Sequence, residues 1–319
     1  MEVKRLPDEQ LIPNPYSYAK LTTMGNVMEV TALEKFPHGS PIRKINKDLY
    51  FDVRNGNVGE YQHGENRADN MKSVRRTLAT VRAVINCNVV QPQNCRWLTF
   101  TYRENMTDTK RLYKDWDTFR RKFARWCSQN GVDKPEYIAV VEPQGRGAWH
   151  LHVFFIWSHP APFLDNNKVV ALLWGQGFTR TKAVTNCDNV GAYFGAYLAD
   201  MPYEEYMKLN DDEMNENVSI EVKTVTDEDG KRLSKKIVKG GRLKMYPPGM
   251  NILRCSKGIK RPVVEKTRYY LAQKKVCDYA QTYKVGFDLL SDDGSSVNRV
   301  YKEYYNKVRD KTQDQKQDK

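Results

Sequence analysis

The segment AWHLHVFFIW, residues 148–157, is the part of the sequence around which the rest is best understood. It contains no Gly or Pro and is rich in aromatic and β-branched residues, which is typical of a buried strand. Since alternate side chains of a strand share a face, His150 and His152 should project side by side. Neutral imidazole is a common metal ligand, so the pair forms half of a divalent metal site. The alternative is that both histidines are structural and satisfied by hydrogen bonds.

The surrounding sequence predicts an α+β domain. Alternation and helical periodicity indicate strands at 97–102, 136–141, 149–157 and 178–184, and helices from about 66 to 85, 115–131, 166–174 and 189–199. From residue 97 the order is β-α-β-β-α-β followed by one more helix, preceded by a helical extension. This is the ferredoxin-like pattern, an antiparallel sheet with helices on one face. Its first and third strands lie at the centre, so the two histidines should lie mid-sheet.

A carboxylate is expected beside the histidines. Glu142 ends the strand that precedes the His-x-His strand, and only a short turn separates the two. A hairpin would therefore bring Glu142 towards His150 and His152, giving a two-histidine, one-carboxylate set. Three protein ligands with open positions suit a catalytic divalent metal, Mg²⁺ or Mn²⁺, although Zn²⁺ or Fe²⁺ would also fit. The alternative is that Glu142 is a solvated turn residue.

The segment VGAYFGAY, residues 190–197, provides a pair of tyrosines. On a helix, Tyr193 and Tyr197 are four residues apart and lie on one face. Gly191 and Gly195 share another side, and each costs about 1 kcal/mol relative to Ala, which suggests close approach to the sheet or to a ligand. Tyrosine can act as a covalent nucleophile. The alternative is that both tyrosines are core aromatics with satisfied hydroxyls.

Composition and charge favour a polyanionic partner. The chain has 319 residues and a net charge of +13, and such a surface suits nucleic acid or an anionic membrane surface. No apolar run reaches the roughly 18 residues of a membrane span, and the N-terminus has no signal-peptide core. The six cysteines show no Cys-x-x-Cys spacing, which suits a reducing compartment. We expect a cytoplasmic nucleic-acid-binding protein without a membrane partner.

The sequence suggests four regions. These are an irregular N-terminal arm (1–65), the α+β domain (66–200), an acidic insert followed by a basic region (201–307) and a disordered polar tail (308–319). The basic region is expected to bind DNA, or else to be an ordinary basic surface. The candidate DNA contacts are Arg146 in the turn before the His-x-His strand and Lys235, Lys236, Lys239, Arg242, Lys244, Arg254, Lys257, Lys260 and Arg261.

Three motifs in order carry a resemblance to a known family. They are Leu98-Thr99-Phe100-Thr101, then Glu142 with His150-Leu151-His152, and then Val190-x-x-Tyr193, with Tyr197 as a second tyrosine. The chain resembles rolling-circle replication initiators of the HUH endonuclease superfamily. The similarity is to the Rep type of plasmids and integrative elements, which is related to filamentous-phage initiators. It covers about residues 66–200.

The resemblance implies a mechanism. A metal on Glu142, His150 and His152 would polarise a scissile phosphate in single-stranded or cruciform origin DNA. Tyr193 would attack it, leaving a 5′-phosphotyrosine link and a free 3′-hydroxyl for a host polymerase, and Tyr197 could attack later. Because no Gly-x-x-x-x-Gly-Lys-Ser/Thr motif is present, a host helicase would be needed.

One departure from the family pattern concerns a lysine that many members carry just after the nucleophile. Here the corresponding positions are Ala196 and Asp200. Another cation would have to take its place, or its role would be dispensable. Arg146 and the basic segment 231–275 are the candidates.

Four other functions remain open at this point. A conjugative relaxase has similar chemistry, although its tyrosine usually precedes the histidine motif. A two-tyrosine transposase has the same motif order. A DNA-binding module could contain these residues as structural ones. A non-haem iron oxygenase uses the same ligand types, but the ferredoxin-like order and the basic surface speak against it.

Overall fold

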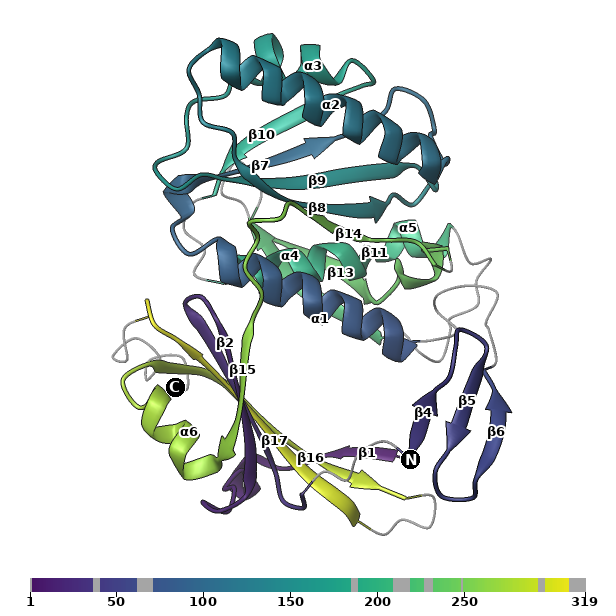
Figure 1. Ribbon diagram of the computed structural model, residues 1–319, viewed down its shortest axis with the longest axis vertical. Coiled ribbons are helices and arrows are strands. Elements are labelled where there is room, and N and C mark those ends of the chain that lie inside the picture. The colour runs from purple at the N-terminus through teal and green to yellow at the C-terminus, as the bar shows by residue number, and fades with distance from the viewer. Residues whose placement is uncertain are drawn as a thin grey trace. The chain divides into compact units, whose positions relative to one another are not determined.

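The computed structural model describes residues 2–36, 41–61, 71–184, 189–208, 219–226, 232–247, 249–291 and 296–309. The chain forms two compact units, one of Glu65–Lys260 and one of Met1–Gly64 with Arg261–Lys319 (Figure 1). Each unit has its own hydrophobic core. Within the described ranges, no helix is long and apolar enough to cross a membrane.

The unit Glu65–Lys260 is built on a five-stranded sheet in the order β10-β7-β9-β8-β14. Its strands are β7 (Cys95–Phe100), β8 (Glu136–Pro143), β9 (Trp149–Ile156), β10 (Thr179–Ala183) and β14 (Leu253–Cys255). All four neighbouring pairs are antiparallel. The mixture of antiparallel sheets and helices is compatible with the predicted α+β class. The His-x-His strand β9 has a neighbour on both sides.

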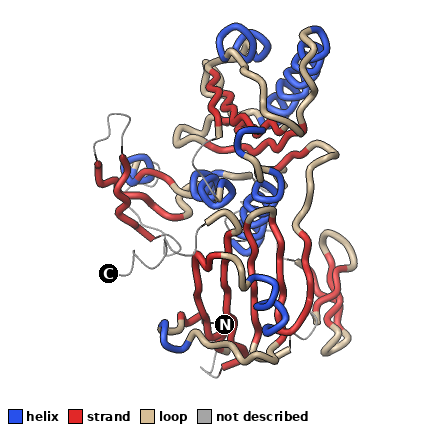
Figure 2. Tube along the Cα trace, turned by 90° about the vertical axis from the view of Figure 1, so that its left-hand side faces the viewer, coloured by secondary structure: helices blue, strands red, loops and turns tan. Residues whose placement is uncertain are grey.

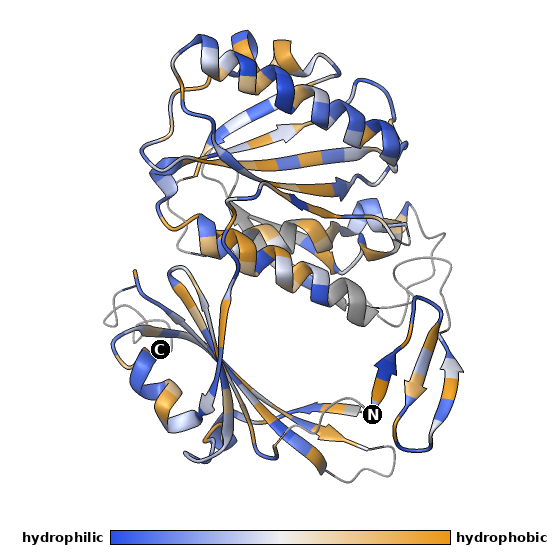
Figure 3. Cartoon of the chain, in the orientation of Figure 1, coloured by the Kyte–Doolittle hydropathy of each residue, from blue (hydrophilic) through white to orange (hydrophobic). Residues whose placement is uncertain are grey.

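One face of this sheet is covered by α2 (Thr109–Gln129), with the π-helical turn η4 (Asn166–Ala171) and α3 (Leu172–Trp174) beside it. The helix α2 starts where Asp108 accepts hydrogen bonds from the backbone N–H groups of Lys110 and Arg111. Its buried side chains recur at helical spacing: Leu112, Trp116, Phe119, Phe123 and Cys127. Figure 3 shows this amphipathic colouring along α2. We call this side of the sheet the α2 face.

The opposite face carries α4 (Val190–Ala199), which packs on α1 (Met71–Asn88). Gly191 permits this packing, because its N–H donates to Asn86 at 2.8 Å and a Cβ there would collide with the Arg82 carbonyl. Nothing lies within 4 Å of a Cβ added at Gly195. The close approach expected from the glycines therefore exists at Gly191, against α1. Phe194 of α4 packs against Phe154 of the sheet.

A second, three-stranded sheet in the same unit has the order β11-β13-β12. It consists of β11 (Met201–Pro202), β12 (Ser219–Thr226) and β13 (Arg232–Lys239), with α5 (Tyr203–Met207) beside it and the turn η5 (Leu243–Met245) after it. The hairpin β12–β13 pairs part of the acidic stretch with part of the basic one. The acidic residues at 209–218 and 227–230 lie outside the described residues.

Strands predominate in the unit of Met1–Gly64 and Arg261–Lys319 (Figure 2). Its six-stranded antiparallel sheet has the order β1-β16-β17-β3-β2-β15. The strands are β1 (Glu2–Arg5), β2 (Tyr18–Met24), β3 (Val27–Leu33), β15 (Val263–Arg268), β16 (Ala280–Leu290) and β17 (Ser296–Asn306), and α6 (Tyr269–Val276) packs on them. A separate sheet holds β4 (Ile42–Lys44), β5 (Leu49–Asp52) and β6 (Asn57–Glu60).

The structure differs from the expected regions at both ends. Residues 1–65, expected to be irregular, contain six strands, of which β1–β3 pair with strands from residues 263–306. These partners are remote in sequence, so local patterns did not reveal them. The expected region 201–307 is divided between the two units after Lys260. Of the expected disordered tail, residues 310–319 lie outside the described residues.

Candidate functional site

Glu142 and the two histidines lie on neighbouring strands. The β8–β9 register places Glu142 opposite His150 and Val140 opposite His152. Cross-strand partners share a face, so all three polar side chains belong to one side of the sheet. His152 Nε2 and Glu142 Oε2 are 2.6 Å apart, and both residues are only 1% exposed. The hairpin therefore brings the carboxylate to the imidazole as the sequence predicts.

Thr99 of β7 fixes the orientation of the His152 ring. Its Oγ1 is 3.2 Å from His152 Nδ1. An ionised Glu142 can only accept, so Nε2 of the neutral imidazole donates to it and Nδ1 accepts from the Thr99 hydroxyl. The motif threonine thus contacts the candidate metal ligand directly.

His150 is partly exposed, and burial lowers its pKa to about 4. The ring is neutral near pH 7, which is the form that binds a metal. The donor types of Glu142, His150 and His152 suit a divalent cation. However, among the described residues no three His, Cys, Asp or Glu side chains are grouped closely enough to hold one. The structure brings Glu142 and His152 into contact, with His150 beside them on the same face.

Arg242 lies beside Glu142 and is buried, although the sequence makes it a candidate DNA contact. Its Nε is 3.4 Å from Glu142 Oε1 and donates to the Asp200 carbonyl at 2.9 Å. Its Nη1 donates to the Pro143 carbonyl at 2.6 Å, and Nη2 is 3.4 Å from Glu205. The guanidinium is therefore occupied with the ends of β8 and α4, because a buried cation needs charged and hydrogen-bonding partners.

Tyr193 lies on the same side of the sheet as the histidines, and we call this side the Tyr193 face. Its side chain is 59% exposed, and its ring meets Trp97 edge-on with 6.1 Å between centroids. Trp97 in turn is 5.9 Å from His152. Phe194 packs under the His152 ring at 5.4 Å. One aromatic ring thus separates the candidate nucleophile from the imidazole. Tyr197 lies in α4, but its side chain is outside the described residues.

The other predicted DNA contacts are dispersed. Arg254 stacks on Tyr113 at 3.6 Å, on the α2 face, because register alternation on β14 directs it there. Lys239 pairs with Asp200 at 2.7 Å and Lys236 lies over Tyr203 at 5.6 Å. Arg146, Lys257, Lys260 and Arg261 are exposed, and Arg261 belongs to the other unit; the side chains of Lys235 and Lys244 lie outside the described residues. Arg146 lines an open cavity with Glu205 and Lys208. The described cations do not form one patch.

Sequence reasoning missed two cations on β10. Arg180 pairs with Thr99 and Lys182 pairs with Trp97, so both lie on the Tyr193 face. Both side chains are exposed. The signal was present as cations at alternate positions in Thr179–Ala183, but the net positive charge of residues 231–275 drew attention instead.

Residues 95–202 match a family model of replication-associated proteins, described as the ORF2 and gene 2 protein type. This likeness supports a replication initiator. The match covers about a third of the 319 residues. No curated protein and no solved structure matches the chain.

The matched segment contains the residues that the geometry brings together. It runs from the start of β7 to β11 and includes Thr99, Glu142, His150, His152 and Tyr193. Arg242 and the basic segment 231–275 lie outside it. The part of the chain that resembles replication-associated proteins is thus the part that carries the Tyr193 face.

Proposed function

We propose that the protein is a rolling-circle replication initiator of the HUH type. It would nick single-stranded DNA at an origin with a site on a ferredoxin-like sheet. The likeness of residues 95–202 to replication-associated proteins supports this. The observation that carries the proposal is the placement of an exposed tyrosine, Tyr193, on the same sheet face as the buried Glu142–His152 pair.

In the proposed reaction the Tyr193 oxygen attacks the scissile phosphorus. A Tyr–O–P bond forms, the bond to the 3′ oxygen breaks, and the proton lost by tyrosine is balanced by the one that the 3′ oxygen gains. The products are a 5′-phosphotyrosine link and a 3′-hydroxyl. The 59% exposure of Tyr193 allows a strand to reach it. Tyr197, one helical turn later, is proposed for the second transfer.

Glu142, His150 and His152 would hold a divalent cation, Mg²⁺ or Mn²⁺. Bound there, the cation would stabilise the negative charge that develops on the phosphate. Thr99 would hold the His152 tautomer, and Arg242 would hold the Glu142 carboxylate in place. These two side chains act through the ligands and would not need to touch DNA.

The proposed partners follow from the reaction. The substrate is a single-stranded or cruciform origin, and a host polymerase would extend the 3′-hydroxyl. A host helicase would open the duplex, and the reaction would take place in the cytoplasm.

A covalent-adduct gel tests the proposal. The full chain is incubated with single-stranded fragments pooled from its own genetic element, with Mn²⁺ or with EDTA. We expect a Mn²⁺-dependent adduct that is lost in Tyr193→Phe. Loss in Tyr197→Phe alone would move the first nucleophile one helical turn. The absence of any adduct in the wild type would overturn the proposal.

A non-catalytic DNA-binding module is the second candidate, because Glu142 and His152 already satisfy each other and no three-residue metal group is assembled in the described ranges. Tight binding without an adduct would favour it. An HUH relaxase or a two-tyrosine transposase would give the same adduct, and only the DNA sites cut would separate these from an initiator.

A further inference from the structure

The edge strand β10 presents its cations to the Tyr193 face. The register aligns Arg180, Thr99 and His152 in one row across β10, β7 and β9. The next row is formed by Lys182, Trp97 and Phe154. Because cross-strand partners project to the same side, Arg180 lies in the row of the candidate ligand His152.

The second row leads to the candidate nucleophile. Lys182 pairs with Trp97, and the Trp97 ring carries Tyr193 at 6.1 Å. Tyr193 and Lys182 therefore flank the same indole. A polyanion bound along β10 would pass beside the tyrosine hydroxyl.

The orientation of β10 is fixed by its other side chains. The hydroxyls of Thr179 and Thr181 each hydrogen-bond to Asn166 Oδ1 at 3.1 Å, on the α2 face. Since a strand alternates, Arg180 and Lys182 are committed to the opposite side. Phe178, two residues before Arg180, is 68% exposed. An exposed aromatic next to alternating cations is the combination that single-strand binding proteins use.

We propose that Phe178, Arg180 and Lys182, which we call the β10 strip, bind the single-stranded DNA that is delivered to Tyr193. Arg180 and Lys182 would contact phosphates about 6.6 Å apart along the strand, and Phe178 would stack on a base. The inference rests on the proposed function for its substrate class. It supplies a DNA contact within the matched segment, where the basic segment 231–275 supplies none.

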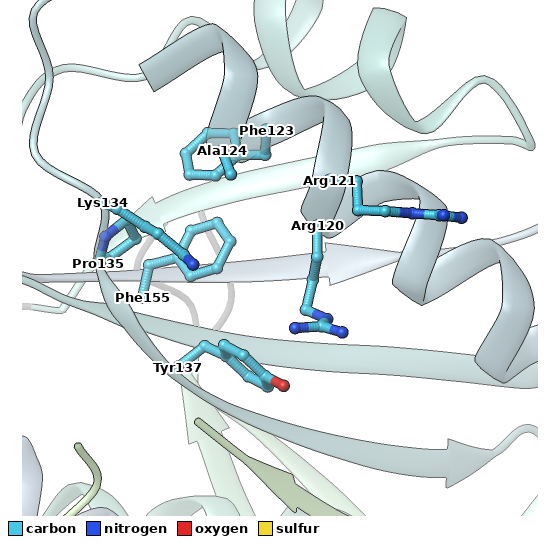
Figure 4. A pocket seen from close by; sticks show the side chains of 8 residues that line it. All are labelled: Arg120, Arg121, Phe123, Ala124, Lys134, Pro135, Tyr137 and Phe155. Atoms are coloured by element: carbon cyan, nitrogen blue, oxygen red, sulfur yellow. The ribbon is translucent and has the colours of Figure 1, made fainter. Parts of the chain in front are cut away.

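The α2 face is the rival basic surface. There Arg120, Arg121 and Lys134 surround a cavity of about 110 Å³ floored by Tyr137 and Phe155 (Figure 4). Arg120 is held by Asp117 at 2.7 Å and lies over the Tyr137 ring at 5.3 Å. DNA bound on that face would have the sheet between it and Tyr193, so the β10 strip is favoured.

The test compares two charge-matched variants of the full chain. Arg180→Gln/Lys182→Gln removes two cations from the β10 strip, and Lys122→Gln/Arg125→Gln removes two exposed cations from α2. Each is made in a Tyr193→Phe background and titrated, without divalent metal, against fluorescein-labelled single-stranded DNA at several salt concentrations. Circular dichroism and thermal melting check that both variants fold.

We expect Arg180→Gln/Lys182→Gln to weaken binding roughly 10- to 30-fold at about 0.1 M salt and to reduce the slope of log K against log salt by about 1.4, that is 0.7 per phosphate contact. Phe178→Ala should weaken binding roughly tenfold while leaving the slope unchanged, because stacking releases no counterions. The α2 variant should bind as the parent does.

Equal affinity of the two double variants would overturn the inference, even if the wild type forms the covalent adduct. Loss of binding in the β10 variant alone, without any adduct in the wild type, would support the β10 strip and overturn the nicking function. The two ideas can therefore fail separately.

Discussion

Arg242 joins three segments through its guanidinium, and its removal should affect folding more than DNA binding. In Arg242→Met, Glu142 loses a buried counter-charge and the carbonyls of Pro143 and Asp200 lose their donor. We expect the free energy of unfolding to fall by about 3–5 kcal/mol. Urea denaturation followed by fluorescence measures the change.

Lys236→Met is the matched control, since Lys236 is an exposed cation of the same basic segment. Its stability should stay close to that of the wild type. If Arg242→Met instead retained full stability and bound DNA more weakly, the buried guanidinium would be a DNA contact after all.

A buried carboxylate in the other unit makes that unit sensitive to alkali. Glu303 accepts hydrogen bonds from the hydroxyls of Tyr269 and Tyr305 at 2.9 and 2.8 Å. Burial, and then the charge of Glu303, raises the pKa of both tyrosines above their ordinary value. A raised folded-state pKa gives stability that is complete below the unfolded value of about 10 and is lost above it.

We therefore expect the free energy of unfolding to decline as the pH rises beyond about 10, and urea titrations across that range measure this. Tyr269→Phe/Tyr305→Phe should decline less steeply, because neither position can then ionise. An equal decline in the wild type and the double variant would show that other groups cause it.

At the scale of elements, the two glycines of α4 provide a matched pair. Gly191→Ala should lower the free energy of unfolding by about 1–3 kcal/mol, because the added methyl meets backbone of α1. Gly195→Ala should raise it by up to about 1 kcal/mol, since its surroundings are open and Ala favours helix. Thermal and urea unfolding of both variants measure the difference, and equal effects would contradict the packing of α4 on α1.

Local periodicity was sufficient for the elements that build the Tyr193 face. The strands β7, β8, β9 and β10 and the helices α2 and α4 occur within a few residues of their expected positions. The period of two also predicted that Glu142 would meet a histidine across a hairpin, as it meets His152. The strand β14 was missed, because a three-residue strand has no period to detect and its partner β8 is remote in sequence.

The environment of each cation could not be predicted from local sequence. The sequence shows the charge of Arg242 and of Arg254, but burial depends on contacts with residues a hundred or more positions away. Net charge over a segment therefore indicated a DNA surface that the described side chains do not form. The cations of β10 required the register of the sheet.

At the scale of the molecule, the unit Glu65–Lys260 should fold without the rest of the chain. It has a separate core and its sheets contain no strand from the other unit. We expect a fragment of residues 65–260 to melt cooperatively and to form the covalent adduct. A fragment of residues 1–260 should be prone to aggregation, because β2 and β3 would lack their partners β15 and β17.

Calorimetry and size-exclusion chromatography of the two fragments measure these outcomes. A soluble, cooperatively folded fragment 1–260 would show that the N-terminal strands do not depend on β15–β17. An unfolded fragment 65–260 would show that the two units are not independent.

The pairing of β2 and β3 with strands from the other end of the chain has a consequence for synthesis. On the ribosome, the first strands emerge long before β17 is made, whereas the segment between them can complete its own sheets at once. The enzyme-like part should therefore mature first, while the N-terminal strands wait as an exposed hairpin that chaperones can bind. Pausing translation before residue 261 would prolong that vulnerable interval.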